Sequence, residues 1–561
     1  MFAKNLELAA QNELIAKVLA KDSKESLRYC IISSHNSGIT YLTNAEGTFH
    51  IPFVSDEDTL NFFLPGFETT KKRVLDLRSE PEVYLSEFVP ESKQYYQPIP
   101  AAKLFSYIRN ASEKLRKKPV LNSLAYLQFS LIAGSQDLEF SRFYYNTLVQ
   151  GSKVLDMNLK HGRSGLAANQ MGLNALAPAK SLIRQAPVQN SKSFPLNPLQ
   201  SSKDISYENL WNFENSKNTL LGDGVSIIFT PREKNDNTLY EGEIWIDTIS
   251  FDIIKLTLKT LNAGIHPFVG NPTDTIANVG IEINIHFSDS IEEGNKLVLI
   301  SYTYSFDYTG DTSFSKVRTR IINDGLIHFY DYSQAFFIPS LASGTMYDDH
   351  LKSGMTPFDS SFWKYNYGIE LTSREVDKIL RIAKNGVLMN YSLPQKSNQP
   401  TKSIFEENNV IWNKDSYLDL ETDDNLPSAE ADFAAYIYCD IDTYKDTLTF
   451  STMTILDKLS TKFNLEYSKQ NLVYQNVYFD LCEIIRLNLD EKLKKLNKID
   501  DMNIACDVAM KDLKSITQKL KSETSHGKNI DKLKKWNDLV YNRTGADNFL
   551  IFGLKYKPKR K

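Results

Sequence analysis

The chain has 561 residues, which is too long for one compact domain and suggests about three to four. Its apolar fraction of 42% is enough to build hydrophobic cores, so wholesale disorder is excluded. The net charge of −4 provides no broad basic face, and nucleic acid is therefore not an expected partner.

Cysteine spacing and the start of the chain bound the class further. The four cysteines form no Cys-x-x-Cys pair, which excludes a zinc knuckle or a redox motif on spacing. No apolar run of about 18 residues exists, so no helix is expected to span a bilayer. Residues 1–24 lack the continuous apolar stretch of a signal peptide. Either the chain is cytoplasmic, or a signal was removed before this numbering begins.

The first region, residues 12–90, alternates short apolar segments with turn residues. Turns are predicted at 44–47, 56–58 and 65–66, and this spacing favours a small β-sandwich. Gly47 and Gly66 are expected in these turns because the backbone there requires a positive φ.

Two segments of this region carry a family resemblance. "TNAEGTFHI" followed by "DTLNFFLPGFET" resembles the carboxypeptidase-regulatory-like, transthyretin-type sandwich at the front of envelope proteins of Bacteroidota. That module carries no catalytic residue in the family, so His35 and His50 are interpreted as turn and strand surface residues. The resemblance implies a docking or spacing role for this region.

The middle region, residues 95–370, is predicted to begin with an amphipathic helix in "PAAKLFSYIRNASEKL". Beyond it, alternating segments such as "IANVGIEINIHFSDS" and "KLVLISYTYSFDYTG" predict an antiparallel curved sheet of many strands with one wet face. The stretch "FTPREKNDNTLYEGEIWIDTISFDIIKLTL" resembles the repeating hairpin of half-barrel periplasmic proteins of the lipoprotein-carrier type. Asp247 and Asp252 are interpreted as turn residues.

Residues 161–200 interrupt this pattern. They are poor in strand periodicity and rich in Ala, Gln, Asn and Ser, which predicts a long surface loop or lid over the open face of the half-barrel. Gly162 and Gly165 do not indicate a phosphate loop, because no Gly-Lys-Ser/Thr follows. The chain also lacks the Gly-x-Ser-x-Gly elbow that an α/β-hydrolase needs.

The last region, residues 400–550, follows a polar, Pro-containing linker and is expected to be an α+β domain rich in helices. Helical periodicity is found at 476–499, 504–523 and 532–545, and the first helix carries a buried apolar stripe.

Five segments of the last region carry a second resemblance. From the first segment to the last, it covers about 140 residues. The segments, in chain order, are "VIWNKDSY", "FAAYIYC", "YQNVYFDLCE", "SETSHG" and "KKWNDLV". This order resembles an uncharacterised bacterial zincin-like family, in which the third segment reads His-Glu-Gln-x-His-Phe-Asp-x-x-Glu. In such a helix two histidines one turn apart bind zinc and the glutamate acts as general base.

Carried over by position, Tyr474 and Tyr478 stand where the paired histidines belong, and Gln475 stands where the general base belongs. Glu483 and His526 match the family pattern. A tyrosine is a poor zinc ligand because its phenol titrates near pH 10, and a glutamine cannot take a proton from bound water. The resemblance therefore implies a pseudo-peptidase with no catalytic residue, no metal and no cofactor. A chance resemblance on an ordinary amphipathic helix leads to the same expectation.

Asp480 also matches the family pattern, and Arg486 lies three residues after Glu483, so a structural ion pair is expected there. His526 is expected to hydrogen-bond a carbonyl or that carboxylate. A former substrate groove is a candidate peptide-binding groove.

The two resemblances together predict a non-catalytic cell-envelope protein. It is expected on the periplasmic side of the outer membrane, as an accessory subunit of a multi-subunit assembly that binds outer-membrane or periplasmic proteins. Its contact with the membrane is expected to be indirect or peripheral. One alternative is a lipid or lipoprotein carrier with a deep apolar cavity in the half-barrel. A second alternative is a metallopeptidase with an unusual site.

Overall fold

The structure is a computed structural model, and it divides into two compact units that are described separately. The sheet unit comprises Met1–Ala335 and Ser360–Tyr391, and the helical unit comprises Phe336–Asp359 and Ser392–Lys561. The structure describes residues 13–87, 98–168, 173, 175–185, 193–199, 209–216, 224–234, 236–268, 274–288, 295–312, 315–339, 348–391, 404–420, 430–444, 447–464 and 468–552. Strands make up 41% of the structure and helices 30%, so the expected multi-domain, mainly β class with a C-terminal α+β part is confirmed.

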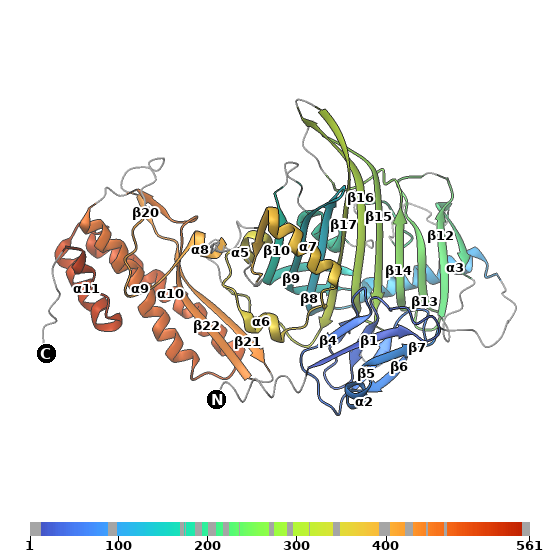
Figure 1. Cartoon of the computed structure of the whole chain (residues 1–561), viewed down its shortest axis with the longest axis horizontal. Helices are drawn as coiled ribbons and strands as arrows, with labels where there is room; N and C mark the ends of the chain where they lie inside the picture. The colour runs from blue at the N-terminus through green and yellow to red at the C-terminus, as the bar shows by residue number, and fades with distance from the viewer. Residues whose placement is uncertain are drawn as a thin grey trace. The chain divides into compact units, whose positions relative to one another are not determined.

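The sheet unit begins with the small β-sandwich predicted for the first region (Figure 1). One sheet has the order β4-β1-β7 and the other β3-β2-β5-β6. The strands are β1 (Leu14–Ala20), β2 (Ile31–Ser34), β3 (Thr40–Leu42), β4 (Thr48–Ile51), β5 (Thr59–Phe63), β6 (Thr70–Arg73) and β7 (Glu82–Leu85), and α2 (Val74–Ser79) follows β6. Gly47 and Gly66 have φ of 74° and 96°, as the turn positions require.

A single antiparallel sheet of 11 strands follows, and it is open rather than closed into a barrel. Its order is β11-β12-β13-β14-β15-β16-β17-β8-β9-β10-β18, so most strands pair with their sequence neighbours. The strands are β8 (Val120–Ala133), β9 (Gln136–Gln150), β10 (Lys153–Ala167), β11 (Trp211–Asn215), β12 (Gly224–Pro231), β13 (Glu241–Asp247), β14 (Ile253–Thr260), β15 (Thr275–Phe287), β16 (Leu297–Thr312), β17 (Ser315–Asp331) and β18 (Gly386–Met389).

The two faces of this sheet differ, because successive side chains of a strand point to opposite faces. We call the face that carries Phe129 and Tyr145 the packed face. Helices α3 (Ala101–Lys117) and α4 (Leu176–Arg184) cover it, as Phe105 of α3 contacts Phe213 of β11 and Lys180 of α4 lies over the Tyr145 ring. The helix predicted near the start of the middle region is thereby confirmed.

The opposite face, which we call the wet face, is covered only in part. The β-sandwich, α6 (Ser360–Tyr365) and α7 (Ser373–Asn385) lie against its β8–β10 and β17 portion. Over β14–β16 its residues are mainly polar and half-buried or exposed, including Lys255, Glu282 and Thr303. The alternation predicted from the sequence is therefore present, with one apolar face and one wet face.

The prediction of a loop or lid over residues 161–200 is wrong in part. Strand β10 runs to Ala167, so Gly162 and Gly165 lie in a strand, and α4 occupies Leu176–Arg184. Small residues obscured the strand pattern because other elements approach closely: a Cβ on Gly165 would lie 3.1 Å from Leu388 Cδ2 and 3.3 Å from Ile382 Cγ2. Residues 169–172, 174, 186–192 and 200 lie outside the described residues.

The helical unit is built around α9 (Lys469–Leu493), which contacts α10 (Ile499–Thr524), α11 (Ile530–Thr544) and strands β21 and β22. Every residue from Val473 to Ile484 is buried, so the middle of α9 is a core helix on all sides. The unit also contains α5 (Asp349–Gly354), α8 (Ile404–Asn408), β19 (Asn409–Ile411), β20 (Glu430–Asp432), β21 (Ala435–Tyr444), β22 (Thr447–Asp457), β23 (Lys462–Asn464) and the short helix η2 (Asn548–Phe552).

These elements confirm the three helices predicted for the last region. Part of the predicted linker, Ile404–Asn408, forms α8. The regions predicted as first and middle domains fall largely in one compact unit, while Phe336–Asp359 belongs to the helical unit.

Candidate functional site

The zincin-like positions of α9 lie inside the core of the helical unit. Tyr474 is fully buried, and Gln475 and Tyr478 are 3% and 6% exposed. The Tyr478 and Tyr474 rings lie 4.7 and 5.9 Å from the Phe433 ring, and the Tyr478 hydroxyl donates a hydrogen bond to the Phe433 carbonyl at 3.2 Å. These tyrosines therefore pack the core where the two histidines of a zincin would face a metal.

The protonation of these phenols follows from their burial. Burial raises the pKa of both Tyr474 and Tyr478 well above 10, so the phenols stay protonated and cannot serve as phenolate ligands at neutral pH. The Tyr474 hydroxyl has no hydrogen-bond partner among the described residues.

Gln475, at the position that the zincin-like resemblance assigns to the general base, is hydrogen-bonded within the protein. The Gln475 side-chain oxygen accepts a hydrogen bond from the Leu420 amide at 3.3 Å. The neighbouring Asn476 accepts from the Leu418 amide at 2.6 Å and donates to the Leu418 carbonyl at 2.8 Å. The two amide side chains thus hold an extended segment against α9, which satisfies backbone groups that would otherwise be buried without partners.

His526 lies in the turn after α10, with φ 57°, and its side chain is exposed. The next residue, Gly527, lies against Tyr474: its carbonyl accepts from Gln470 at 2.6 Å, and an added Cβ would meet Tyr474 Cβ at 2.7 Å. The fold therefore brings the His526 segment to the first turns of α9. The hydrogen bond expected of the imidazole is not among those found in the described residues.

The remaining zincin-like positions form polar contacts farther along α9. Glu483 is 3% exposed and makes a bidentate ion pair with Arg486, at 2.6 and 2.7 Å, which confirms the predicted pair. Glu483 also accepts from the Thr454 hydroxyl at 2.7 Å, and Arg486 reaches Asp490 at 2.7 Å. Bidentate, partly buried pairs of this kind tie the helix to the β22 strand.

Asp480 is a further buried carboxyl of this unit, 6% exposed. Its oxygens accept hydrogen bonds from Trp412 Nε1 at 2.7 Å and from Asn548 Nδ2 at 2.6 Å. Desolvation nevertheless raises its pKa to about 6. Asp480 therefore joins α9 to the segment after β19 and to η2, and the described contacts give it a structural role.

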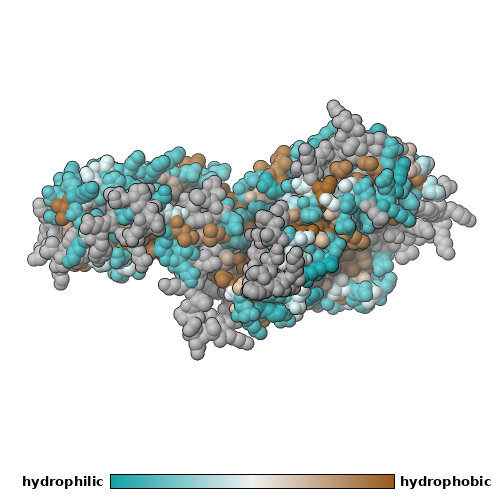
Figure 2. Space-filling model, turned by 90° about the horizontal axis from the view of Figure 1, so that it is seen from above, coloured by the Kyte–Doolittle hydropathy of each residue, from teal (hydrophilic) through white to brown (hydrophobic). Residues whose placement is uncertain are grey.

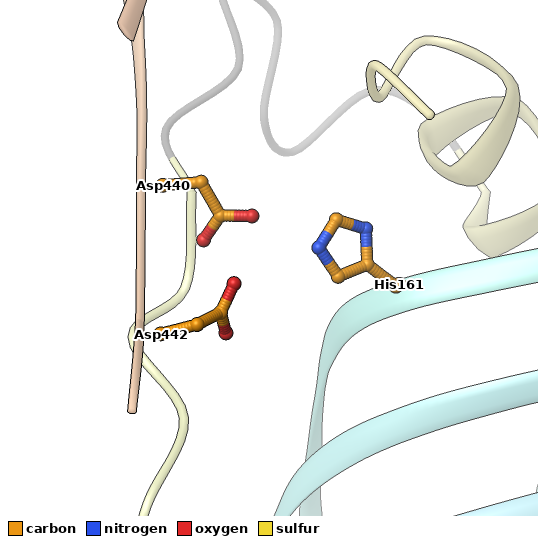
Figure 3. A group of neighbouring side chains, drawn as sticks. All are labelled: His161, Asp440 and Asp442. Carbon is orange, nitrogen blue, oxygen red and sulfur yellow. The ribbon is translucent and has the colours of Figure 1, made fainter. Parts of the chain in front are cut away.

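Two further acids, Asp440 and Asp442, lie two residues apart on β21 and point to the same side of the strand (Figure 3). Asp440 accepts a hydrogen bond from the Tyr438 hydroxyl at 3.0 Å. His161, drawn in the same figure, belongs to β10 of the sheet unit. The two acids alone do not define a metal site.

A cavity of about 500 Å³ lies on the wet face of the sheet unit, and no sequence pattern predicted its position. Its floor comes from β8 and β14–β17, and its rim from two turns of the β-sandwich and the first turn of α7. The charged lining residues are Arg28, Lys255, Glu282, Asp324, Arg374, Glu375 and Lys378. A volume of this size suits a small ligand.

Part of this polar lining is bonded within the protein. Lys378 Nζ donates to Ser130 Oγ at 2.9 Å, and that hydroxyl lies 3.2 Å from the Asp324 carboxylate. Glu375 completes the capping box of α7 with Thr372 and accepts from Gln128 at 2.7 Å. These bonds fix the floor and the helix in one arrangement, and they occupy two of the three acids.

Other lining groups have no such partners. Among the described residues, Lys255 and Arg374 make no hydrogen bond and no ion pair; Lys255 only lies over the Trp245 ring, at 5.3 Å. His286 is 8% exposed and its Nδ1 has no hydrogen-bond partner there. Burial and then the nearby Lys255 lower the pKa of His286 to about 3, so its imidazole is neutral.

The rim of the cavity is held in place by an anchor between the β-sandwich and the sheet. His328, fully buried on β17, lies 3.0 Å from Thr40 Oγ1 and 2.9 Å from the Tyr367 hydroxyl, which accepts from the Leu42 amide at 3.2 Å. Burial lowers the pKa of His328 to about 3. His50, interpreted from the sequence as a strand surface residue, is half-buried and lies 3.0 Å from Glu370.

Two interpretations of turn residues were drawn from the sequence. Asp247 is confirmed: its carboxylate accepts from the Ile249 and Ser250 amides at 2.9 and 2.7 Å. Asp252 lies in the same turn, where its carbonyl accepts from the Asp247 amide at 3.0 Å; its carboxylate also pairs with Lys114 of α3 at 2.7 Å and lies 3.6 Å from Lys118.

No family model matches the chain, and no curated protein matches it either. Among the described helices, none combines the length and the apolar character needed to cross a membrane.

Proposed function

We propose that this chain is a non-catalytic cell-envelope protein, a periplasm-facing accessory subunit of an outer-membrane assembly that binds partner proteins. The observation that carries the non-catalytic part is the state of α9. Tyr474, Gln475 and Tyr478, at the zincin-like positions, are buried and packed or hydrogen-bonded within the protein. A catalytic zinc needs three protein ligands and an open position for water, and these positions offer neither.

The binding role is supported by how the large sheet is covered. Helices α3 and α4 fill its packed face, and the cavity on its wet face has a mainly polar lining. Neither feature suits an acyl chain, which favours an accessory subunit over the carrier alternative. On the face drawn in Figure 2, apolar and hydrophilic side chains are interspersed. Large apolar side chains at the surface include Leu261 (73% exposed) and Ile249 (71% exposed).

The placement in the envelope rests on the resemblance of residues 12–90 to the regulatory-like sandwich. Its test is purification of the tagged chain from its native membranes in mild detergent, followed by size exclusion and mass spectrometry. We expect an outer-membrane barrel or a lipoprotein to co-elute in fixed stoichiometry. Elution of the chain alone, with lipid in the extract, would contradict the proposal and favour the carrier.

The non-catalytic part has a separate test. Protein purified without chelator is expected to contain less than stoichiometric zinc by elemental analysis. If the protein contains stoichiometric metal, and Tyr474→Phe with Tyr478→Phe abolishes it, the result would contradict the non-catalytic proposal and support the metallopeptidase alternative.

A further inference from the structure

The cavity on the wet face has a function that the accessory role does not require. We propose that it binds a small hydrophilic oxyanion, a carboxylate or a phosphate group, between Lys255 of β14 and Arg374 of α7.

The first support is a charge pattern that the protein itself does not neutralise. Four cationic residues line the cavity, and none of them forms an ion pair among the described residues: Arg28, Lys255, Arg374 and Lys378. Arg28 donates to the Tyr29 hydroxyl and Lys378 to Ser130, which leaves Lys255 and Arg374 without a hydrogen-bond acceptor. An oxyanion supplies the acceptors that both lack.

The second support is that the acidic residues of the lining accept hydrogen bonds from donors within the protein. Glu375 is held by the α7 capping box and by Gln128, and Asp324 accepts from Ser130. Glu282, the third acid, lies 3.4 Å from the Asn284 amide nitrogen. Each carboxylate is therefore turned toward a protein donor, and the charged lining groups without a hydrogen bond among the described residues are Lys255 and Arg374.

The third support comes from two features of the cavity lining, the start of α7 and the buried imidazole of His286. Thr372 and Arg374 place the start of α7, a helix of 13 residues whose first turn is held by its capping box, at the cavity. His286 pairs with Lys255 across β14 and β15 and is more than nine-tenths buried, with its Nδ1 unpartnered. A neutral imidazole beside Lys255 offers a polar group without competing for the anion.

The neutral part of the lining defines the rest of the ligand. Asn284, Ser301 and Thr303 lie on the same face, in register across β15 and β16, and Tyr29 lies at the rim. Hydroxyl and amide groups beside an aromatic ring suit a hydroxyl-rich ligand that carries one anionic group. Such a ligand fits in about 500 Å³, whereas a long acyl chain would leave these polar groups unpaired.

The test is isothermal titration calorimetry of the full chain with two probes, inorganic phosphate and galacturonate. We expect at least one probe to bind with a dissociation constant below about 1 mM. Binding of phosphate alone identifies a phosphoryl ligand, and binding of galacturonate alone identifies a sugar acid. Failure of both probes to bind would overturn the proposal.

Variants locate the site. Lys255→Gln with Arg374→Gln is expected to weaken binding at least about tenfold, because both charged donors are removed. The matched control is Lys117→Gln with Lys384→Gln, which removes two exposed cations, one on α3 and one on α7, that do not line the cavity. Equal affinity in both double variants would overturn the proposal. Each variant is first checked by thermal unfolding, and if the double variant does not fold, the two single variants take its place.

Discussion

The two units of this protein differ in how far their polar side chains are bonded within the protein. Along α9 of the helical unit, Gln475, Asp480 and Glu483 all find partners within the protein. On the wet face of the sheet unit, Lys255 and Arg374 have no hydrogen bond or ion pair among the described residues. Fully partnered polar groups fix a fold, whereas unpartnered ones around a cavity are available to a ligand. The contacts along α9 therefore support the proposed non-catalytic role, and the cavity on the wet face is the site for which we propose a ligand.

The comparison also extends to pH. In the sheet unit burial holds His286 and His328 neutral, with pKa values of about 3. In the helical unit burial raises the pKa of Asp480 to about 6. Burial disfavours the charged form in both cases, so it lowers a histidine pKa and raises that of an acid. The two units are therefore expected to respond to acid in opposite directions.

The largest expected effect tests whether α9 is a core helix. Tyr474→Ala removes a fully buried ring and is expected to destabilise the helical unit by about 3–5 kcal/mol. Tyr474→Phe is the matched control: it removes a buried hydroxyl without a hydrogen-bond partner and is expected to be neutral or stabilising. Thermal unfolding measures both, and the transition that shifts in the alanine variant identifies the helical unit. A large loss of stability in the phenylalanine variant would contradict this assignment.

The next effect is the acid response of the sheet unit. His286 and His328 have folded-state pKa values below the ordinary value of 6.5, so the unfolded chain binds more protons between pH 6.5 and about 3. Their contribution to stability is present above pH 6.5 and is lost as the pH falls through this window. The loss is on the order of a few kcal/mol for each histidine, since one pKa unit corresponds to about 1.4 kcal/mol.

Thermal unfolding of the other transition as a function of pH measures this loss. His286→Gln with His328→Gln is expected to flatten its acid limb. An unchanged slope in that variant would show that other groups govern the response.

The opposite slope is expected in the helical unit. The folded-state pKa of Asp480 lies above its ordinary value of 3.8, so its contribution to stability is full below pH 3.8 and is lost as the pH rises through about 6. The change amounts to about 3 kcal/mol over this window. Asp480→Asn keeps a hydrogen-bond acceptor for Trp412 and is expected to remove this slope in a pH series of unfolding curves. A slope that survives the substitution would assign it to another carboxyl.

The smallest effect contrasts the cations of the two units. Arg486→Ala leaves the buried Glu483 without its bidentate partner and is expected to cost about 1–3 kcal/mol. Lys255→Ala removes a cation with no hydrogen bond or ion pair and is expected to change stability by less than about 0.5 kcal/mol. Chemical denaturation compares the two variants. Equal costs would mean that Lys255 has a structural partner, which would weaken the argument for a ligand.

Local patterns predicted much of the fold because they report on local structure. The alternation in "IEINIH" placed Ile283 and Ile285 on the apolar face, and it also placed Glu282, Asn284 and His286 together on the wet face. The spacing of Glu483 and Arg486 predicted their ion pair, since residues three apart are neighbours on a helix. The wet-face residues could have been recognised as a polar row, but the sequence of one strand does not show which polar row other elements will cover to form a cavity.

The failures have a common cause in contacts between distant segments. The glycines of β10 look like a loop in sequence, yet α7 and β18 approach too closely for larger side chains. The exposed imidazole of His526 was expected to hydrogen-bond, but the turn that carries it contacts α9 through Gly527 instead. The linear order of α9 also could not show that Leu418 and Leu420 would bond to Asn476 and Gln475.

The sequence by itself determined the mainly β class, the sandwich turns, the helices of the last region and the absence of a His-Glu-x-x-His motif from α9, because each depends on residue identity and short-range spacing. The tertiary structure alone decided where a cavity forms. That cavity requires β14–β17, two turns of the sandwich and the start of α7 to meet, although Arg28 and Arg374 are hundreds of residues apart in the chain. Only the packing of those elements determines which polar groups find partners and which remain available to a ligand.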